Sequence, residues 1–128
     1  MNQHISDDKN RLDELCRTVR QLVGRQNFSK CEKLIFEAMR KYPHAPEPHN
    51  LIGVVFEKKG DHVSAMKHFR AAWSLDPTYI PARHNLDLYG TFDVKGKCAF
   101  DESDCLADEE KGNRKMSGVD SKNEESSL

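Results

Sequence analysis

The sequence matches itself at an offset of 34 residues, and this period constrains the fold more than any other feature. Six pairs of positions agree in residue type across the offset: Leu22 with Phe56, Asn27 with Asp61, Cys31 with Ala65, Ile35 with Phe69, Ala38 with Ala72, and Pro43 with Pro77. A repeat of this length predicts small units that bury their apolar faces only by stacking on one another. We therefore expect one stacked domain.

Apolar residues within the repeats recur at the spacing of a helix. Five such faces occur between residues 11 and 91: Leu12/Leu15/Val19/Leu22, Leu34/Ile35/Ala38/Met39, Leu51/Ile52/Val55/Phe56, Ala65/Phe69/Ala72/Trp73 and Leu86/Tyr89. The connections between them are short, which places successive helices antiparallel. The predicted fold class is all-α, an antiparallel stack of helix hairpins with about two and a half repeats.

Residues that begin and end helices occupy the junctions. Asn27 and Asp61 can each accept a hydrogen bond from an exposed N–H group in the following turn, and Gly60 suits the left-handed end of a helix. Prolines mark the remaining boundaries: Pro43 and Pro77 end the second and fourth helices, and Pro46 and Pro81 fit the first turn of the next.

The stretch from Pro46 to Pro77 resembles the tetratricopeptide repeat family, and the chain looks like a short bacterial-type member. Counted from Pro46, the matching places hold Gly53 at the eighth, Phe56 at the eleventh, Gly60 at the fifteenth, Ala65 at the twentieth, Phe69 at the twenty-fourth, Ala72 at the twenty-seventh, and the closing Pro77. His49 departs from the pattern, because the family most often has tryptophan there. The first repeat is more degenerate, with Val19 and Gln26 in place of a small residue and a glycine.

The resemblance implies a superhelix whose inner groove, lined by the first helix of each pair, binds peptides without catalysis. By position, the lining residues are Cys16, Arg20, Val23, Glu47, Asn50, Val54, Glu57, His84 and Leu88. Arg20, Asn50 and His84 form a polar strip suited to an acidic peptide, although they are also explained as unused surface. Cys16 and Val54 stand where a carboxylate-clamp groove would need polar donors, so that specialised mode is not expected.

The chain divides into three parts. They are a polar N-terminal lead (1–10), a helical domain (11–91, with repeats at 12–45 and 46–79 and a terminal helix at 80–91), and an acidic tail (92–128). The tail has too few large apolar residues to offset its ordering entropy, so most of it is expected to be disordered. Its candidate docking segment, residues 92–106, includes Phe92, Val94 and Phe100. The tail is either a solubilising appendage or a built-in competitor for the groove.

Three aromatic residues, Phe56, Phe69 and Trp73, are predicted to be core residues rather than a binding platform, because they follow helical spacing inside the matched repeat. Cys98 and Cys105 are separated by six residues, more than paired zinc ligands prefer. A metal- or redox-responsive pair of these cysteines, with the repeats used for docking, is the alternative function. We expect no metal, no cofactor and no enzyme, because catalytic groups do not converge in any recognisable motif.

Charge and hydropathy narrow the partners. Residues 98–128 carry nine acids and four bases, whereas the other 97 residues have a balance of +4. This balance does not predict a nucleic-acid binder, and no apolar run is long enough to predict a membrane partner. We expect a cytoplasmic chain that binds a protein or peptide, with reduced cysteines. A homodimer through an exposed end of the stack is also expected, because end units expose apolar edges.

Overall fold

Helices dominate the computed structural model, which describes residues 2–91 and 96–105. Five helices follow one another in residues 2–91: α1 (Asn2–Gly24), α2 (Phe28–Lys41), α3 (Glu47–Lys58), α4 (His62–Leu75) and α5 (Ile80–Tyr89). The all-α prediction is therefore confirmed for the described residues. The predicted disorder of the tail beyond residue 105, and the expected docking of Phe92 and Val94, lie outside them.

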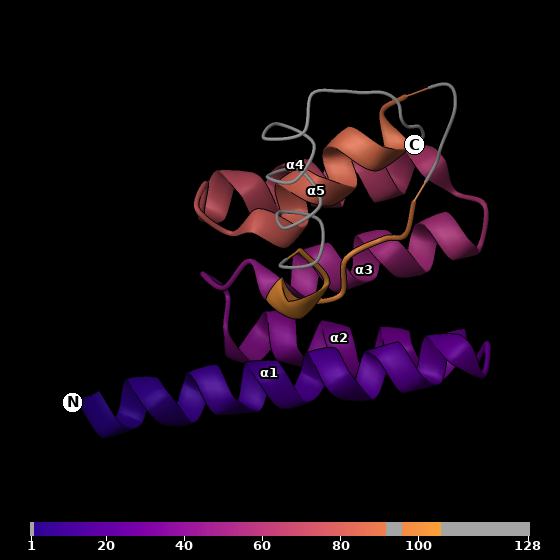
Figure 1. The fold of residues 1–128 in the computed structure, drawn as a ribbon. Helices are drawn as coiled ribbons and strands as arrows, with labels where there is room; N and C mark the ends of the chain where they lie inside the picture. The colour runs from indigo at the N-terminus through magenta and orange to yellow at the C-terminus, as the bar shows by residue number, and fades with distance from the viewer. Residues whose placement is uncertain (1, 92–95, 106–128) are drawn as a thin grey trace.

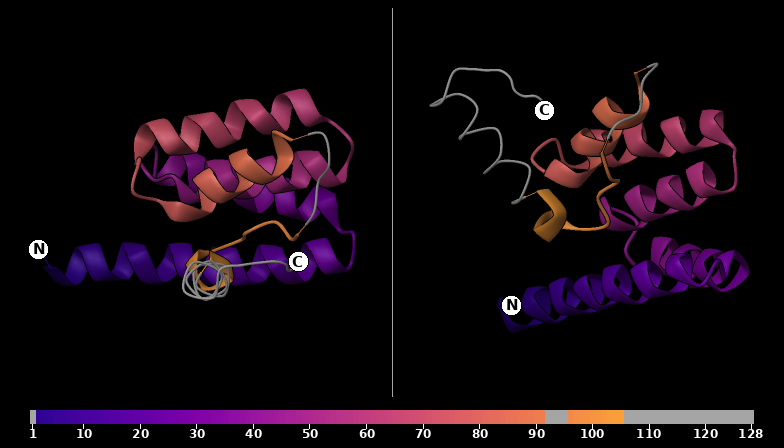
Figure 2. Two further views of the ribbon diagram at one scale, coloured as in Figure 1. Left: turned by 45° about the horizontal axis from the view of Figure 1, so that its top comes forward. Right: turned by 45° about the vertical axis from the view of Figure 1, so that its right-hand side comes forward.

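Consecutive helices run in opposite directions and pack on one another (Figure 1). Helix α3 also contacts α1 and α5. These three helices form one face of the molecule, which we call the inner face, and α2 and α4 lie behind it (Figure 2). Residues 96–105 return across the inner face and end in a single helical turn at 102–105.

Local capping bonds begin α2 and α4 where the sequence predicts. The Asn27 side chain accepts a hydrogen bond from the Lys30 N–H group, and the Asp61 side chain accepts one from the Ser64 N–H group. Each bond satisfies a donor that the first helical turn leaves without a partner. Helices α2 and α4 end two residues before their prolines. The predicted helix boundaries at these junctions are confirmed.

The turns of the two hairpins share a left-handed residue. Gly60, between α3 and α4, has a φ of 91°, and Gln26, its counterpart 34 residues earlier, has a φ of 58°. A left-handed conformation is costly for a residue with a β-carbon. The repeat therefore keeps its turn geometry even where its glycine has been replaced.

Helix α1 begins at Asn2, earlier than the periodic segment that starts near residue 11. The first ten residues contain neither glycine nor proline, so nothing in them breaks a helix. The Lys9 ammonium lies 3.5 Å from the Asp13 carboxylate, a spacing of four residues that supports a helix. The polar lead thus forms the first turns of α1.

The core runs between the inner face and the helices behind it. Its largest fully buried side chains include Phe69, Ile35, Leu51 and Ile52. The prediction that Trp73 is a core residue is wrong, because its side chain is 43% exposed. Helix α4 packs chiefly on α3 and α5. In the described chain no further helix follows to cover the outer side of α4.

A pair of histidines packs between α3 and α4. The Nδ1 atoms of His49 on α3 and His68 on α4 lie 3.1 Å apart, and the two rings stack. Phe56 stacks on His68 in turn. Burial lowers the pKa of both histidines. The lowered pKa values favour a neutral pair, in which a nitrogen of one ring donates to the other.

Gly53 lets α3 and α4 approach closely. A β-carbon built at Gly53 would lie 2.4 Å from the Cε1 atom of Phe69, which is fully buried. An aromatic ring held on all sides cannot retreat from such a contact without moving α4. Gly53 therefore sets the distance between these two helices.

Replacing Gly53 with alanine should lower the free energy of unfolding by about 1–3 kcal/mol, because overpacking a buried site typically costs that much. Gly24→Ala is the matched control, because nothing lies within 4 Å of a β-carbon built there. That substitution should be neutral or stabilising by about 0.5–1 kcal/mol. Urea unfolding followed by circular dichroism measures both. An unchanged midpoint for Gly53→Ala would contradict the assignment of a tight contact.

Candidate peptide-binding site

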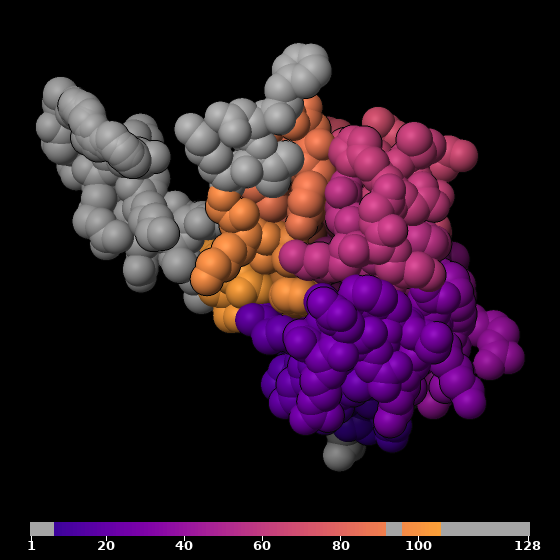
Figure 3. All heavy atoms as spheres, turned by 90° about the vertical axis from the view of Figure 1, so that its right-hand side faces the viewer, coloured from indigo at the N-terminus to yellow at the C-terminus, as the bar shows by residue number. Residues whose placement is uncertain are grey.

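The inner face holds a peptide already, because residues 96–105 of the same chain lie across it. We call these residues the docked segment. Its hydrogen bonds and ion pairs reach α1 through Arg20 and Lys9, α3 through Asn50, and α5 through Asn85. Figure 3 shows the yellow-orange atoms of the docked segment against the purple atoms of the N-terminal half.

Two buried asparagines hold both main-chain groups of one residue, Ala99. The Nδ2 atoms of Asn50 and Asn85 donate to the Ala99 carbonyl oxygen at 3.0 and 2.9 Å. The Ala99 N–H group donates to the Oδ1 atom of Asn85 at 2.8 Å. Asn85 also donates to the Oδ1 atom of Asn50 at 2.8 Å. All three residues are fully buried, so these bonds satisfy groups that water does not reach.

Arg20 binds the acidic end of the docked segment. Its two terminal nitrogens donate to the two carboxylate oxygens of Asp104 at 3.1 and 3.0 Å, and Nη2 lies 3.0 Å from the Asp101 carboxylate. The guanidinium carbon lies 5.2 Å from the centre of the Phe100 ring. Paired bonds between a guanidinium and a carboxylate are strong and direction-specific. Arg20 therefore contacts both the carboxylates and the aromatic ring of the docked segment.

The ion pair between Arg20 and Asp101 keeps its charges near neutral pH. Burial raises the pKa of Asp101, but hydrogen bonds from Ser103 and the charge of Arg20 outweigh it, so the pKa lies below its usual value. A lowered carboxyl pKa contributes stability above the unfolded value, about 3.9, and that stability is lost as the pH falls further. The Arg20–Asp101 pair thus stabilises the docked segment at neutral pH and is lost as the pH falls through the lowered pKa of Asp101.

Other residues of the docked segment contact α5 and the apolar core. The Nε2 atom of His84 donates to the carbonyl oxygen of Lys97 at 2.7 Å. Phe100 is half-buried and packs against both main apolar clusters of the core. Leu88 lies close to Gly96, since a β-carbon there would lie 3.7 Å from the Cδ1 atom of Leu88. Main-chain, apolar and charged contacts therefore all hold the same ten residues.

Glu47 is the least satisfied group on the inner face. Its side chain is buried, its Oε2 atom lies 3.7 Å from the Lys9 ammonium, and its Oε1 atom has no hydrogen-bond partner within the described residues. Burial raises the pKa of Glu47, against the effect of Lys9, and the nearby charge of Glu102 raises it further. The docked segment thus places an acid beside a carboxylate that is already poorly stabilised.

The remaining predicted lining residues are placed as follows: Cys16 and Val23 lie in the core cluster that Phe100 also touches, Val54 lies in the cluster shared with Cys98, and Glu57 is hydrogen-bonded to His62. The pKa of Cys16 is raised to about 12, chiefly by burial. Cys16 is therefore a packed thiol rather than a polar contact. Arg20, Asn50 and His84, the predicted polar strip, all contact the docked segment.

Sequence reasoning missed Asn85, the residue with most bonds to Ala99. An offset of 34 residues aligns Asn50 with His84, but the structure places Asn85 beside Asn50. The tripeptide His-Asn-Leu at 49–51 recurs at 84–86, an offset of 35. This repeat was the available signal, and it shows that the last helix is shifted by one residue relative to the full repeats.

The two tail cysteines belong to the docked segment, and both are buried. Burial raises the pKa of Cys98, whose thiol faces Tyr89. A raised pKa disfavours the reactive thiolate form. In the described residues no group of three or more His, Cys, Asp or Glu side chains is placed to hold a metal ion. The structure adds nothing that favours a metal- or redox-responsive pair.

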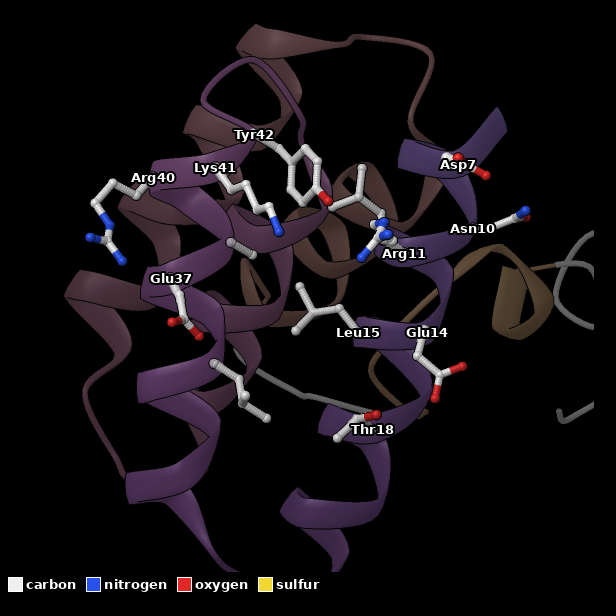
Figure 4. A pocket seen from close by; sticks show the side chains of 13 residues that line it. Asp7, Asn10, Arg11, Glu14, Leu15, Thr18, Glu37, Arg40, Lys41 and Tyr42 are labelled. Atoms are coloured by element: carbon white, nitrogen blue, oxygen red, sulfur yellow. The ribbon is translucent and has the colours of Figure 1, made fainter. Parts of the chain in front are cut away.

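A hollow of about 910 Å³ lies between α1 and α2, away from the docked segment (Figure 4). Its lining combines Leu15 and Leu34 with acidic side chains such as Glu37 and basic ones such as Arg11. Acids and bases occur together around it, so its charge favours no single ligand. It marks the exposed side of the first hairpin.

No protein-family model, curated protein or solved structure matches this chain. Within the described residues, no helix is long and apolar enough to cross a membrane.

Asn85→Ala should destabilise the chain more than Asn50→Ala. Loss of Asn85 leaves the Ala99 N–H group and the Asn50 oxygen without partners, at a cost of about 2–4 kcal/mol. When Asn50 is lost, the Ala99 carbonyl oxygen still accepts a hydrogen bond from Asn85. This substitution should therefore cost about 1–2 kcal/mol. Urea unfolding and hydrogen exchange at the Ala99 amide measure the difference. Equal losses would contradict the assigned bond pattern.

Glu47→Gln should stabilise the chain more at pH 8 than at pH 4, two values on either side of the unfolded carboxyl pKa of about 4.3. Because the pKa of Glu47 is raised on folding, its contribution to stability falls as the pH rises through the folded value. Glutamine removes this loss. Urea midpoints at several pH values test it, with Glu14→Gln on the exposed side of α1 as control. A pH-independent difference between Glu47→Gln and wild type would contradict it.

Proposed function

We propose that this chain is a non-catalytic protein-interaction module whose inner face acts as the concave groove of a tetratricopeptide-like stack. In this proposal the groove binds a peptide segment of a partner protein. The groove helices are α1, α3 and α5, the first helix of each hairpin and the terminal helix. The docked segment then occupies the site on this chain to which the partner segment would bind.

The observation that carries the proposal is the pair of hydrogen bonds between the Asn85 amide and the main chain of Ala99, one donated by Asn85 and one by Ala99, reinforced by Asn50. Main-chain N–H and C=O groups are present in every peptide. A pair of buried amides that bonds both groups can therefore hold an extended peptide regardless of most of its sequence. Neighbouring side chains then supply the specificity.

Several features support the tetratricopeptide-like arrangement. Antiparallel hairpins follow the 34-residue period, and the left-handed turn recurs at Gln26 and Gly60. Gly53 and Phe69 meet where a small and a large residue are expected at a helix crossing. About two full hairpins and one further helix account for residues 2–91.

The proposed compartment is the cytoplasm, where thiols stay reduced. All four cysteines lie in the described chain, each is buried, and none of them forms a disulfide. The exposed side of the first hairpin, with its hollow between α1 and α2, is the end through which the expected homodimer would form. That homodimer stays a prediction.

Affinity capture with the tagged full chain tests the groove. Arg20→Glu combined with Asn50→Ala should reduce the recovered partner tenfold or more, because one lost buried polar contact alone is worth about 1–3 kcal/mol. Arg70→Glu is the matched control, since it makes the same charge change on an exposed residue of α4. Mass spectrometry quantifies recovery, and thermal unfolding confirms that each variant is folded. Equal recovery with wild type and the double variant would rule out the groove.

A further inference from the structure

We propose that the ligand of the inner face is an acidic peptide with a defined pattern: a small residue, an aromatic residue, an aspartate, two further residues and a second aspartate. Residues 99–104, Ala-Phe-Asp-Glu-Ser-Asp, are a resident copy of this pattern that a partner must displace. This inference rests on the proposed peptide-binding function and specifies the ligand of the same site.

The first position must be small. Ala99 is fully buried, and both of its main-chain groups are fixed by buried asparagines. The β-carbon therefore has a set position in a fully buried site. A longer side chain would have to displace the atoms packed around it, so the site favours alanine, glycine or serine.

The second position must be aromatic. Phe100 touches both main apolar clusters of the core, and the Arg20 guanidinium lies 5.2 Å from its ring centre. An aliphatic side chain could fill the apolar contact, but it has no negative ring face to attract the cation. One residue thus joins the apolar floor of the site to its cationic edge.

The two aspartates are spaced by the shape of the peptide itself. Asp101 accepts hydrogen bonds from the N–H and hydroxyl groups of Ser103, which lies in the helical turn at 102–105. Asp104 accepts from the N–H group of Phe100 at 2.8 Å, so the turn closes back on the aromatic residue. This folding brings both carboxylates to Arg20. Aspartates at other spacings would not reach one guanidinium together.

The resident copy is tethered but imperfect. Only four residues separate Thr91 from Gly96, and so short a connection gives an effective concentration on the order of 1 mM. Against that advantage, the segment leaves the Oε1 atom of Glu47 unsatisfied and places Glu102 close to the same carboxylate. A partner that avoids an acid at that place therefore competes better than the segment does.

A labelled peptide with the sequence of residues 96–105 tests the pattern in reducing buffer by fluorescence anisotropy. The full chain is compared with a release variant, Asp101→Asn with Asp104→Asn, which weakens the docked segment and leaves the inner face unaltered. The release variant should bind the peptide at least tenfold more tightly than wild type does. Peptides carrying the same two asparagines, or leucine at position 99, should bind the release variant at least tenfold more weakly.

A charge exchange tests the role of Arg20 directly. When Arg20→Asp is added to the release variant, a peptide with lysine at positions 101 and 104 should bind better than the native peptide. Arg20 is partly exposed, so this change does not bury a charge. In wild type, an excess of unlabelled native peptide should speed hydrogen exchange at the Ala99 amide, a readout that needs no variant to fold.

The outcomes separate this inference from the proposed function. If the release variant binds native and asparagine peptides equally, the acidic pattern is wrong and main-chain binding stands. If a folded release variant binds neither, both proposals fail. If wild type binds as tightly as the release variant, or if the Ala99 amide exchange is unchanged by peptide, residues 99–104 are not a displaceable copy.

Discussion

The buried amide network around Ala99 is the contact on which the arrangement of the chain depends. Asn50 and Asn85 lie on different helices, and each is fully buried, so each needs partners that the core cannot supply. The docked segment supplies them. A polar network in an apolar setting is stabilising only when all its members are bonded. The network therefore couples the position of α5 to that of α3 and makes both depend on what occupies the inner face.

The uneven charge of the sequence acquires a structural meaning from this arrangement. The last 31 residues are net acidic and the preceding 97 are net basic. Some of these opposite charges pair across the inner face, where Arg20 contacts Asp101 and Asp104. Lys9 adds a weaker, exposed contact with Glu102. The docked segment is thus held by ion pairs at its acidic end and by main-chain bonds and the packing of Phe100 beside them.

Local sequence signals predicted the helices, but not every contact between them. Asn27 caps a helix through a residue three positions away, so its role can be read from the sequence. The burial of Trp73 depended on a following helix that does not cover it in the described chain. The role of Asn85 did not follow from the 34-residue period, because the last helix is shifted by one residue relative to the repeats. Asp104 could not be paired by pattern, because its partner Arg20 is 84 residues away.

Gly53 has a consequence for the thermodynamics of recognition. By seating the ring of Phe69 against the backbone of α3, it fixes that helix one turn after Asn50. An amide held in place before a peptide arrives does not lose rotational freedom when the peptide binds. In the binding that we propose, the entropic cost of association then falls mainly on the incoming segment. The absence of one methyl group at Gly53 thereby contributes to the preorganisation of the inner face.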